Sequence, residues 1–170
     1  MASVTALAEY PGRVEEVFMN KKISANGIYA IQFFALNIPI TIIIDDWLPL
    51  RRWGNSFTTW FAKVGDDGSL WGPLIEKAFS KFHGNYWRTV GGDPVDGIST
   101  LNGSPYDRLW MDETPLDEVW ITLSTYDIDN RRGLMVAGTP NSPDFNTKNE
   151  YGLLYDHAYT ILSVHTLSNG

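Results

Sequence analysis

The spacing of hydrophobic residues is most regular over residues 70–82, where it predicts an amphipathic α-helix. Apolar side chains recur there every three or four positions, which is the period that brings them onto one face of a helix: Leu70, Trp71, Leu74, Ile75, Ala78, Phe79 and Phe82. Gly84 follows this stripe, at a position where a glycine commonly ends a helix. We therefore expect the helix to bury its apolar stripe against a sheet.

Short runs rich in β-branched and aromatic residues predict strands at residues 28–35, 40–44 and 57–62. The run 40–44 is apolar on both faces, so we expect it to be buried on both faces. A further short apolar run predicts a strand at residues 134–137. Residues 153–167 are expected to close the chain as a long strand or hairpin.

Two further helices and two loops complete the predicted elements. Residues 13–18 read as a short helix, and a second helix is predicted over residues 114–126 because Thr114 can cap it and Pro115 suits its first position. Its expected buried face consists of Leu116, Val119, Trp120 and Leu123. Residues 91–105 are rich in Gly, Pro and Asp and predict a long ordered loop, and residues 139–150 also predict a loop.

This mixture of strands and helices, without a repeating strand–helix–strand rhythm, predicts an α+β fold in one domain spanning residues 1–170. Hydrophobic residues make up 44% of the chain, a composition typical of a folded protein and not of a disordered one. The formal net charge of −7 disfavours binding to a phosphate backbone, so nucleic acid is not expected as a partner.

Cysteine is absent from the sequence, which excludes disulfides, thiolate metal sites and a cysteine nucleophile within this chain. The absence also fits a reducing, intracellular and cytoplasmic compartment. Residues 1–10 do not read as a signal peptide, and the apolar run 38–44 is too short to span a membrane, so no membrane span is expected.

Three histidines are the first candidates for acid–base chemistry. His83 lies at the polar end of the first long helix, where a helix-terminal cation is the simplest interpretation, and His165 lies in the predicted last strand as a structural or surface residue. His157 stands where a polar loop enters a β-branched strand, and a rigid strand holding an imidazole suits a general base. Considered alone, His157 is still more often a structural residue than a catalytic one.

Pairs of carboxylates are weaker candidates. Asp45 and Asp46 end a predicted strand and point to opposite faces, so they are expected to bind backbone donors and not to form an acid–base dyad. Asp93 and Asp96 could bind a hard cation such as calcium, but two carboxylates are too few to define a site. No metal site is therefore assigned to this chain.

Several segments together resemble the protease core of calpains, which are cysteine proteases. The resemblance rests on Asp45-Asp46-Trp47-Leu48-Pro49 after an apolar run, on the Glu76-Lys77-Ala78 helix with Gly91-Gly92 beyond it, on Asn26-Gly27-Ile28-Tyr29, and on His157-Ala158-Tyr159. Their order and spacing agree from about Tyr10 to Leu167. The resemblance implies that His157 is the catalytic base of the histidine-bearing subdomain, which is papain-like. It further implies a twisted antiparallel, partly barrel-like sheet flanked by helices.

The same resemblance implies which parts of an intact enzyme this chain does not supply. The family's cysteine and oxyanion-hole glutamine belong to a cysteine subdomain of the same polypeptide, and that subdomain would be a partner of this chain alongside protein substrates. The catalytic asparagine lies in Asn-Pro-Trp, which Asn169-Gly170 does not match. No cofactor is expected within this chain, and calcium is possible in the intact enzyme.

One departure from the family pattern affects the site itself. Calpains usually carry glycine before the histidine, whereas this chain carries Asp156, which we expect to border the substrate and alter the first specificity pocket. The isolated chain is expected to be inactive because it has no thiol. A non-catalytic calpain-like interaction or scaffold module is the alternative, and the flanking sequence would separate the two.

Overall fold

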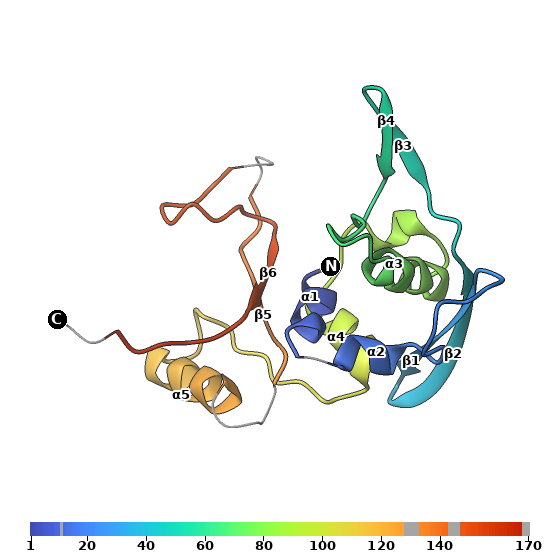
Figure 1. Ribbon diagram of the computed structural model, residues 1–170. Coiled ribbons are helices and arrows are strands. Elements are labelled where there is room, and N and C mark those ends of the chain that lie inside the picture. The colour runs from blue at the N-terminus through green and yellow to red at the C-terminus, as the bar shows by residue number, and fades with distance from the viewer. Residues whose placement is uncertain (11, 128–132, 143–146, 168–170) are drawn as a thin grey trace.

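The protein is described by a computed structural model that covers residues 1–10, 12–127, 133–142 and 147–167. Within these residues the architecture is mixed α+β, with helices and three separate two-stranded antiparallel sheets (Figure 1). The elements in chain order are α1 (Ala2–Ala8), α2 (Arg13–Val17), β1 (Ile28–Ala35), β2 (Ile38–Asp45), β3 (Leu50–Trp53), β4 (Ser56–Thr59), α3 (Trp71–Phe82), a 3-10 helix (Tyr86–Thr89), α4 (Pro94–Asn102), α5 (Leu116–Asp127), β5 (Met135–Gly138) and β6 (Ala158–Ile161).

The hairpin of β1 and β2 forms the first sheet, with register running from Ile28 opposite Asp45 to Ala35 opposite Ile38. Leu36 and Asn37 connect the strands, and both have positive φ angles, of 49° and 63°. Positive φ at both central residues is the conformation of a type I′ turn, whose twist matches that of the flanking strands. The predicted strand 28–35 is confirmed, and the predicted strand 40–44 extends further at both ends.

Helix α3 buries the centre of its predicted apolar stripe beside this hairpin, whereas Leu70 precedes the helix and is exposed. Leu74, Ile75 and Ala78 are buried in one hydrophobic core with Ile31 and Phe33 of β1, Ile44 of β2, and residues from α1, α2 and α4. The rings of Phe79 and Phe82 each form a T-shaped pair with the Phe33 ring, and their centroids lie 6.3 and 6.2 Å from that of Phe33. Figure 1 shows α2, α3 and α4 close to the β1–β2 hairpin, with α1 beside α4.

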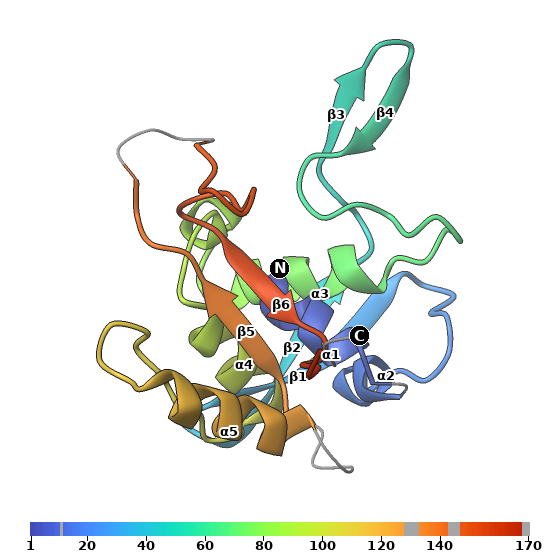
Figure 2. The same ribbon diagram turned by 90° about the vertical axis from the view of Figure 1, so that its left-hand side faces the viewer.

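The second sheet is a hairpin of β3 and β4 that projects from the body of the molecule (Figure 2). Strand β4 overlaps the strand predicted at residues 57–62 but begins and ends earlier in the chain. Its partner β3 was not predicted. Leu50, Trp53 and Phe57 are mostly exposed on it, at 57%, 70% and 69%. Its short strands pair with each other and not with β1 or β2.

The third sheet pairs β5 with β6, from Met135 opposite Ile161 to Gly138 opposite Ala158. This pair lies against α1 and is not joined to either other sheet (Figure 2). Thr160 Oγ1, for example, donates a hydrogen bond of 2.9 Å to the carbonyl of Ala2. The partly barrel-like sheet expected from the resemblance is therefore wrong within the described residues, because helices separate the hairpins and no strand continues from one sheet to the next.

Several local predictions also need correction. Residues 91–105 do not form a loop throughout, because Asp93 caps α4 and Pro94 begins it. The run 40–44 is not buried on both faces, since Thr41 and Ile43 are exposed in a sheet of only two strands. The closing segment 153–167 forms only the short strand β6 within its described structure.

Helix α5 exposes two of the four residues that were expected to form its buried face, and Leu123 is half-buried. Val119 is buried, but Leu116 and Trp120 are 72% and 42% exposed, and Ile121 is 63% exposed. Figure 1 shows α5 apart from α3 and the β1–β2 hairpin, and no α5 residue belongs to the hydrophobic core around them. A spacing that suits burial does not by itself supply a surface to bury against, so the predicted face is only partly correct.

Candidate functional site

His157 immediately precedes β6 and its side chain is exposed. The sequence places it there because a polar segment ends at this point and the β-branched strand begins. The β5–β6 pairing ends at Gly138 opposite Ala158, and the next residue on each side brings Thr139 opposite His157. A strand therefore supports the candidate base from one side, as the sequence suggested.

The main chain of His157 is held by Thr139. Thr139 N donates to the carbonyl oxygen of His157 at 2.9 Å, and His157 N donates to Thr139 Oγ1 at 3.0 Å. The Thr139 hydroxyl also lies 2.7 Å from the carbonyl of Leu154 and 3.1 Å from that of His157. The sequence predicts a loop at Thr139 and indicates no role for it, because the contact with His157 depends on the strand register.

The imidazole of His157 contacts the ring of Tyr159, with centroids 5.0 Å apart and planes inclined by 64°. The Tyr159 hydroxyl oxygen accepts a hydrogen bond of 2.9 Å from Leu154 N. Tyr159 thus links the candidate base to the segment that precedes it. His-Ala-Tyr was part of the family resemblance, and the alternation of side chains along a strand explains why residues 157 and 159 lie on the same side.

Asp156 adopts the left-handed backbone region, with φ of 51°, and is exposed. Its N–H donates to the carbonyl of Pro140 at 3.0 Å, and its carboxylate Oδ2 accepts from Ser142 N at 3.0 Å. Glycine adopts this backbone region without strain, and aspartate tolerates it better than most other residues. The conformation gives a physical reason why glycine would suit this position in relatives, and why aspartate can replace it.

The other two histidines have different surroundings. His83 is the C-cap of α3, as expected, and its ring packs against Phe79 and Phe82 with centroids 4.3 and 4.9 Å away. Its Nε2 is buried without a hydrogen-bond partner. His165 lies beyond β6 and not within a strand, and its Nε2 is 2.8 Å from Ser163 Oγ on an exposed segment.

The acidic residues considered from the sequence have structural partners. Asp45 Oδ1 accepts from Trp47 N at 2.9 Å and pairs with Lys77, and the Lys77 hydrogen bond is the main cause of a lowered Asp45 pKa. The predicted backbone bonding at this strand end is thus confirmed for Asp45. Asp93 accepts from Val95 N and pairs with Arg108. In the part of the chain that the structure describes, no group of three or more His, Asp or Glu side chains could hold a metal ion.

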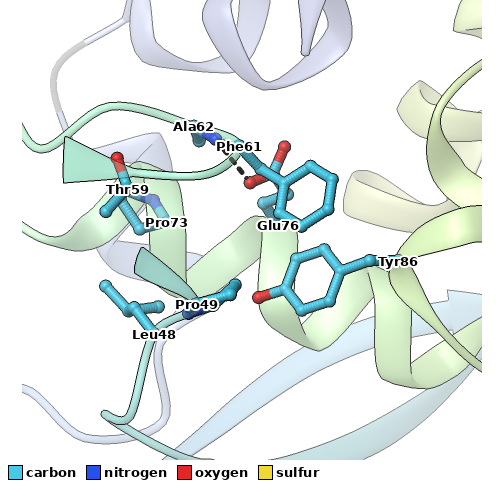
Figure 3. A pocket seen from close by; sticks show the side chains of 8 residues that line it. All are labelled: Leu48, Pro49, Thr59, Phe61, Ala62, Pro73, Glu76 and Tyr86. Atoms are coloured by element: carbon cyan, nitrogen blue, oxygen red, sulfur yellow. Dashed lines mark hydrogen bonds between the residues drawn. The ribbon is translucent and has the colours of Figure 1, made fainter. Parts of the chain in front are cut away.

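A small pocket lies at the base of the β3–β4 hairpin, against α3 (Figure 3). Eight residues line it: Leu48, Pro49, Thr59, Phe61, Ala62, Pro73, Glu76 and Tyr86. Burial raises the pKa of Glu76, although the hydrogen bond that its carboxylate accepts from Ala62 N at 2.7 Å opposes this shift. Burial, with Glu76 and Asp45 nearby, raises the pKa of Tyr86 to about 12, and its ring stacks on Phe61 at 4.4 Å. The Thr59 hydroxyl is buried without a partner.

No helix among the described residues is long and apolar enough to cross a membrane. The exposed His157, supported by Thr139 and flanked by Asp156 and Tyr159, is the arrangement here best suited to proton transfer. It lacks a cysteine nucleophile, since the chain contains no cysteine.

Comparison with known proteins identifies the family of this chain. The chain is 28% identical over 171 residues to the calpain-type cysteine protease DEK1 of Zea mays, covering 96% of this chain and 8% of that protein. It is 25% identical over 174 residues to a calpain of Schistosoma mansoni, covering 99% of this chain and 22% of that protein. The chain therefore spans less than a quarter of the length of either relative. A family model described as calpain family cysteine protease matches residues 1–170, and the chain belongs to this family.

Proposed function

We propose that this chain is the histidine-bearing part of a calpain-like cysteine endopeptidase, with His157 as general base and with one wall of the substrate cleft. The observation that carries the proposal is the exposed imidazole of His157 at the entrance to β6, on a main chain held by Thr139. An exposed imidazole on a supported backbone can approach a nucleophile from another part of the polypeptide while keeping its own position. Family membership over the whole chain supplies the reaction class.

In this proposal the cysteine comes from the partner subdomain of the same polypeptide. His157 takes the thiol proton, which generates the thiolate that attacks the carbonyl carbon of a peptide bond. The resulting imidazolium then gives that proton to the departing amine, and the acyl-enzyme is released by water. An asparagine from the family's Asn-Pro-Trp motif, which this chain does not match, would orient the imidazole, as in papain-like triads.

Asp156 is proposed to border the substrate beside the base. Its carboxylate is exposed, and its hydrogen bond from Ser142 N directs one carboxylate oxygen toward the main chain. A negative charge at this position would favour substrates with a basic or neutral side chain there over acidic ones. Calcium remains a prediction for the complete enzyme; the described residues offer no cluster to hold it, so no step above uses it.

The test is peptide hydrolysis by the complete polypeptide, with His157→Ala compared with His83→Ala and His165→Ala. Replacing His157 removes both the base that ionises the thiol and the acid that protonates the amine, so turnover should fall by about three orders of magnitude or more. His83→Ala should act only through stability, since its half-buried ring packs on Phe79, and His165→Ala should leave turnover unchanged.

Each variant is checked for folding by near-ultraviolet circular dichroism before its turnover is compared. Full turnover by a folded His157→Ala variant would remove His157 from the catalytic role. A complete polypeptide without an upstream cysteine and without hydrolysis would favour the alternative, a calpain-like interaction or scaffold module. The isolated 170-residue chain should neither hydrolyse peptides nor react with thiol-directed reagents, because it has no thiol.

A further inference from the structure

We infer that Thr139 is the positioning residue for His157, acting through its hydroxyl and its amide on the main chain of the base. This inference rests on the catalytic role proposed above for His157. Its basis is that both main-chain polar groups of His157 bond to this one residue: the carbonyl accepts from Thr139 N, and the N–H donates to Thr139 Oγ1.

The hydroxyl takes the place of a main-chain acceptor in the ladder. Residues directly opposite in a hydrogen-bonded antiparallel pair exchange two main-chain bonds. Thr139 and His157 make only one such bond, of 2.9 Å, and the His157 N–H turns to the hydroxyl at 3.0 Å. The regular pairing of β5 and β6 ends at Gly138 and Ala158, so the threonine side chain extends the support by one residue to the base itself.

The same hydroxyl connects His157 to the segment that precedes it. A hydroxyl has a single proton to donate, and the carbonyl of Leu154 is its closer acceptor, at 2.7 Å against 3.1 Å for the carbonyl of His157. The hydroxyl therefore bridges the Leu154 carbonyl and the His157 amide. Leu154 N in turn donates to the hydroxyl of Tyr159, whose ring contacts the imidazole. Thr139 and Tyr159 thus hold Leu154 at its two main-chain polar groups.

This support matters because the chain turns sharply just before the base. Asp156 has a φ of 51°, so the direction of the main chain entering His157 is not set by regular strand geometry. A shift of about 1 Å in a catalytic group can cost about a hundredfold in rate. The bridge through Thr139 opposes such a shift from within this chain, independently of any contact that the partner subdomain provides.

Three variants separate the hydroxyl from the rest of the side chain. Thr139→Val keeps the shape and removes the bridge, Thr139→Ser keeps the hydroxyl, and Thr125→Val on α5 is the matched control away from β5 and β6. In the 170-residue chain, amide exchange measured by NMR should be about three- to tenfold faster at His157 in Thr139→Val, as expected for losing one hydrogen bond. Thr139→Ser and Thr125→Val should match the unmodified chain.

In the complete polypeptide, Thr139→Val should lower kcat by about tenfold to a hundredfold with little change in KM, and Thr139→Ser should restore most of it. An unchanged His157 exchange rate in Thr139→Val would overturn the contact. Faster exchange with unchanged kcat would make Thr139 structural only and overturn its positioning role, while loss of turnover in His157→Ala would still uphold the proposed function. If His157→Ala retained turnover, the proposed function would fail, and this inference with it.

Discussion

The ring of Phe34 lies where a β-carbon at Gly103 would stand, with Cδ1 only 2.6 Å from that position. Gly103 ends α4 with φ of 66°, and Phe34 belongs to β1. An alanine here would combine left-handed strain of about 1–2 kcal/mol with an overpacking cost of about 1–3 kcal/mol. We expect Gly103→Ala to lower the free energy of unfolding, measured by urea denaturation, by the sum of these effects.

Gly68→Ala is the matched control, because Gly68 has φ of 81° and no atom within 4 Å of the added β-carbon. It should show the backbone strain alone. Equal losses at the two positions would show that the Phe34 ring moves aside without cost.

Leu74→Ala should lower the free energy of unfolding by about 2–5 kcal/mol, through lost burial and the cavity left behind. Leu74 is 4% exposed in the core beside Ile31 and Phe33, whereas Leu116 of α5 is 72% exposed. Leu116→Ala removes the same atoms from water-exposed surface and should change stability by less than about 0.5 kcal/mol. A small loss at Leu74 in thermal or urea unfolding would contradict the packing of α3 against the β1–β2 hairpin.

Glu76→Gln should change how stability depends on pH. Burial raises the pKa of Glu76 in the folded protein, so folding favours its protonated form, and its contribution to stability is greatest below its ordinary pKa. That contribution declines as pH rises through the raised folded-state pKa. Glutamine keeps an oxygen to accept from Ala62 N without a charge, so the stability of Glu76→Gln relative to the unmodified chain should increase from about pH 4 to about pH 7.

Glu76→Ala serves as the comparison, since it removes the acceptor as well as the charge. It should lose about 1 kcal/mol for the Ala62 hydrogen bond. If the difference between Glu76→Gln and the unmodified chain were the same at both pH values, the raised pKa of Glu76 would be refuted.

Asp156→Val should destabilise the corner before His157 by about 1–2 kcal/mol, because a β-branched residue is strained at φ of 51°. Asp156→Asn should be nearly neutral, since asparagine tolerates this region and keeps an oxygen to accept from Ser142 N. Asp156→Gly removes the strain but loses that hydrogen bond, so its effect should lie between the other two. Urea unfolding of the three variants measures the order, and a neutral Asp156→Val would contradict the left-handed conformation.

Local pattern was sufficient for several parts of this protein. The stripe from Leu70 to Phe82 predicted α3, and the β-branched run 28–35 predicted β1, because each pattern depends only on residues close together in the sequence. Motif order identified the calpain family, which the match over residues 1–170 confirms. It also made His157 the candidate base, whose catalytic role remains a prediction.

Other features depend on contacts between residues far apart in the sequence, and only the tertiary structure decided them. The hairpins could not be predicted to remain separate sheets, because strand pairing depends on which surfaces the helices occupy. The exposure of Leu116 and Trp120 depends on what lies opposite α5, which their spacing does not encode. Thr139 acquired a candidate role only when the β5–β6 register placed it opposite His157, because a hydroxyl becomes a support only when a donor lies within hydrogen-bonding distance.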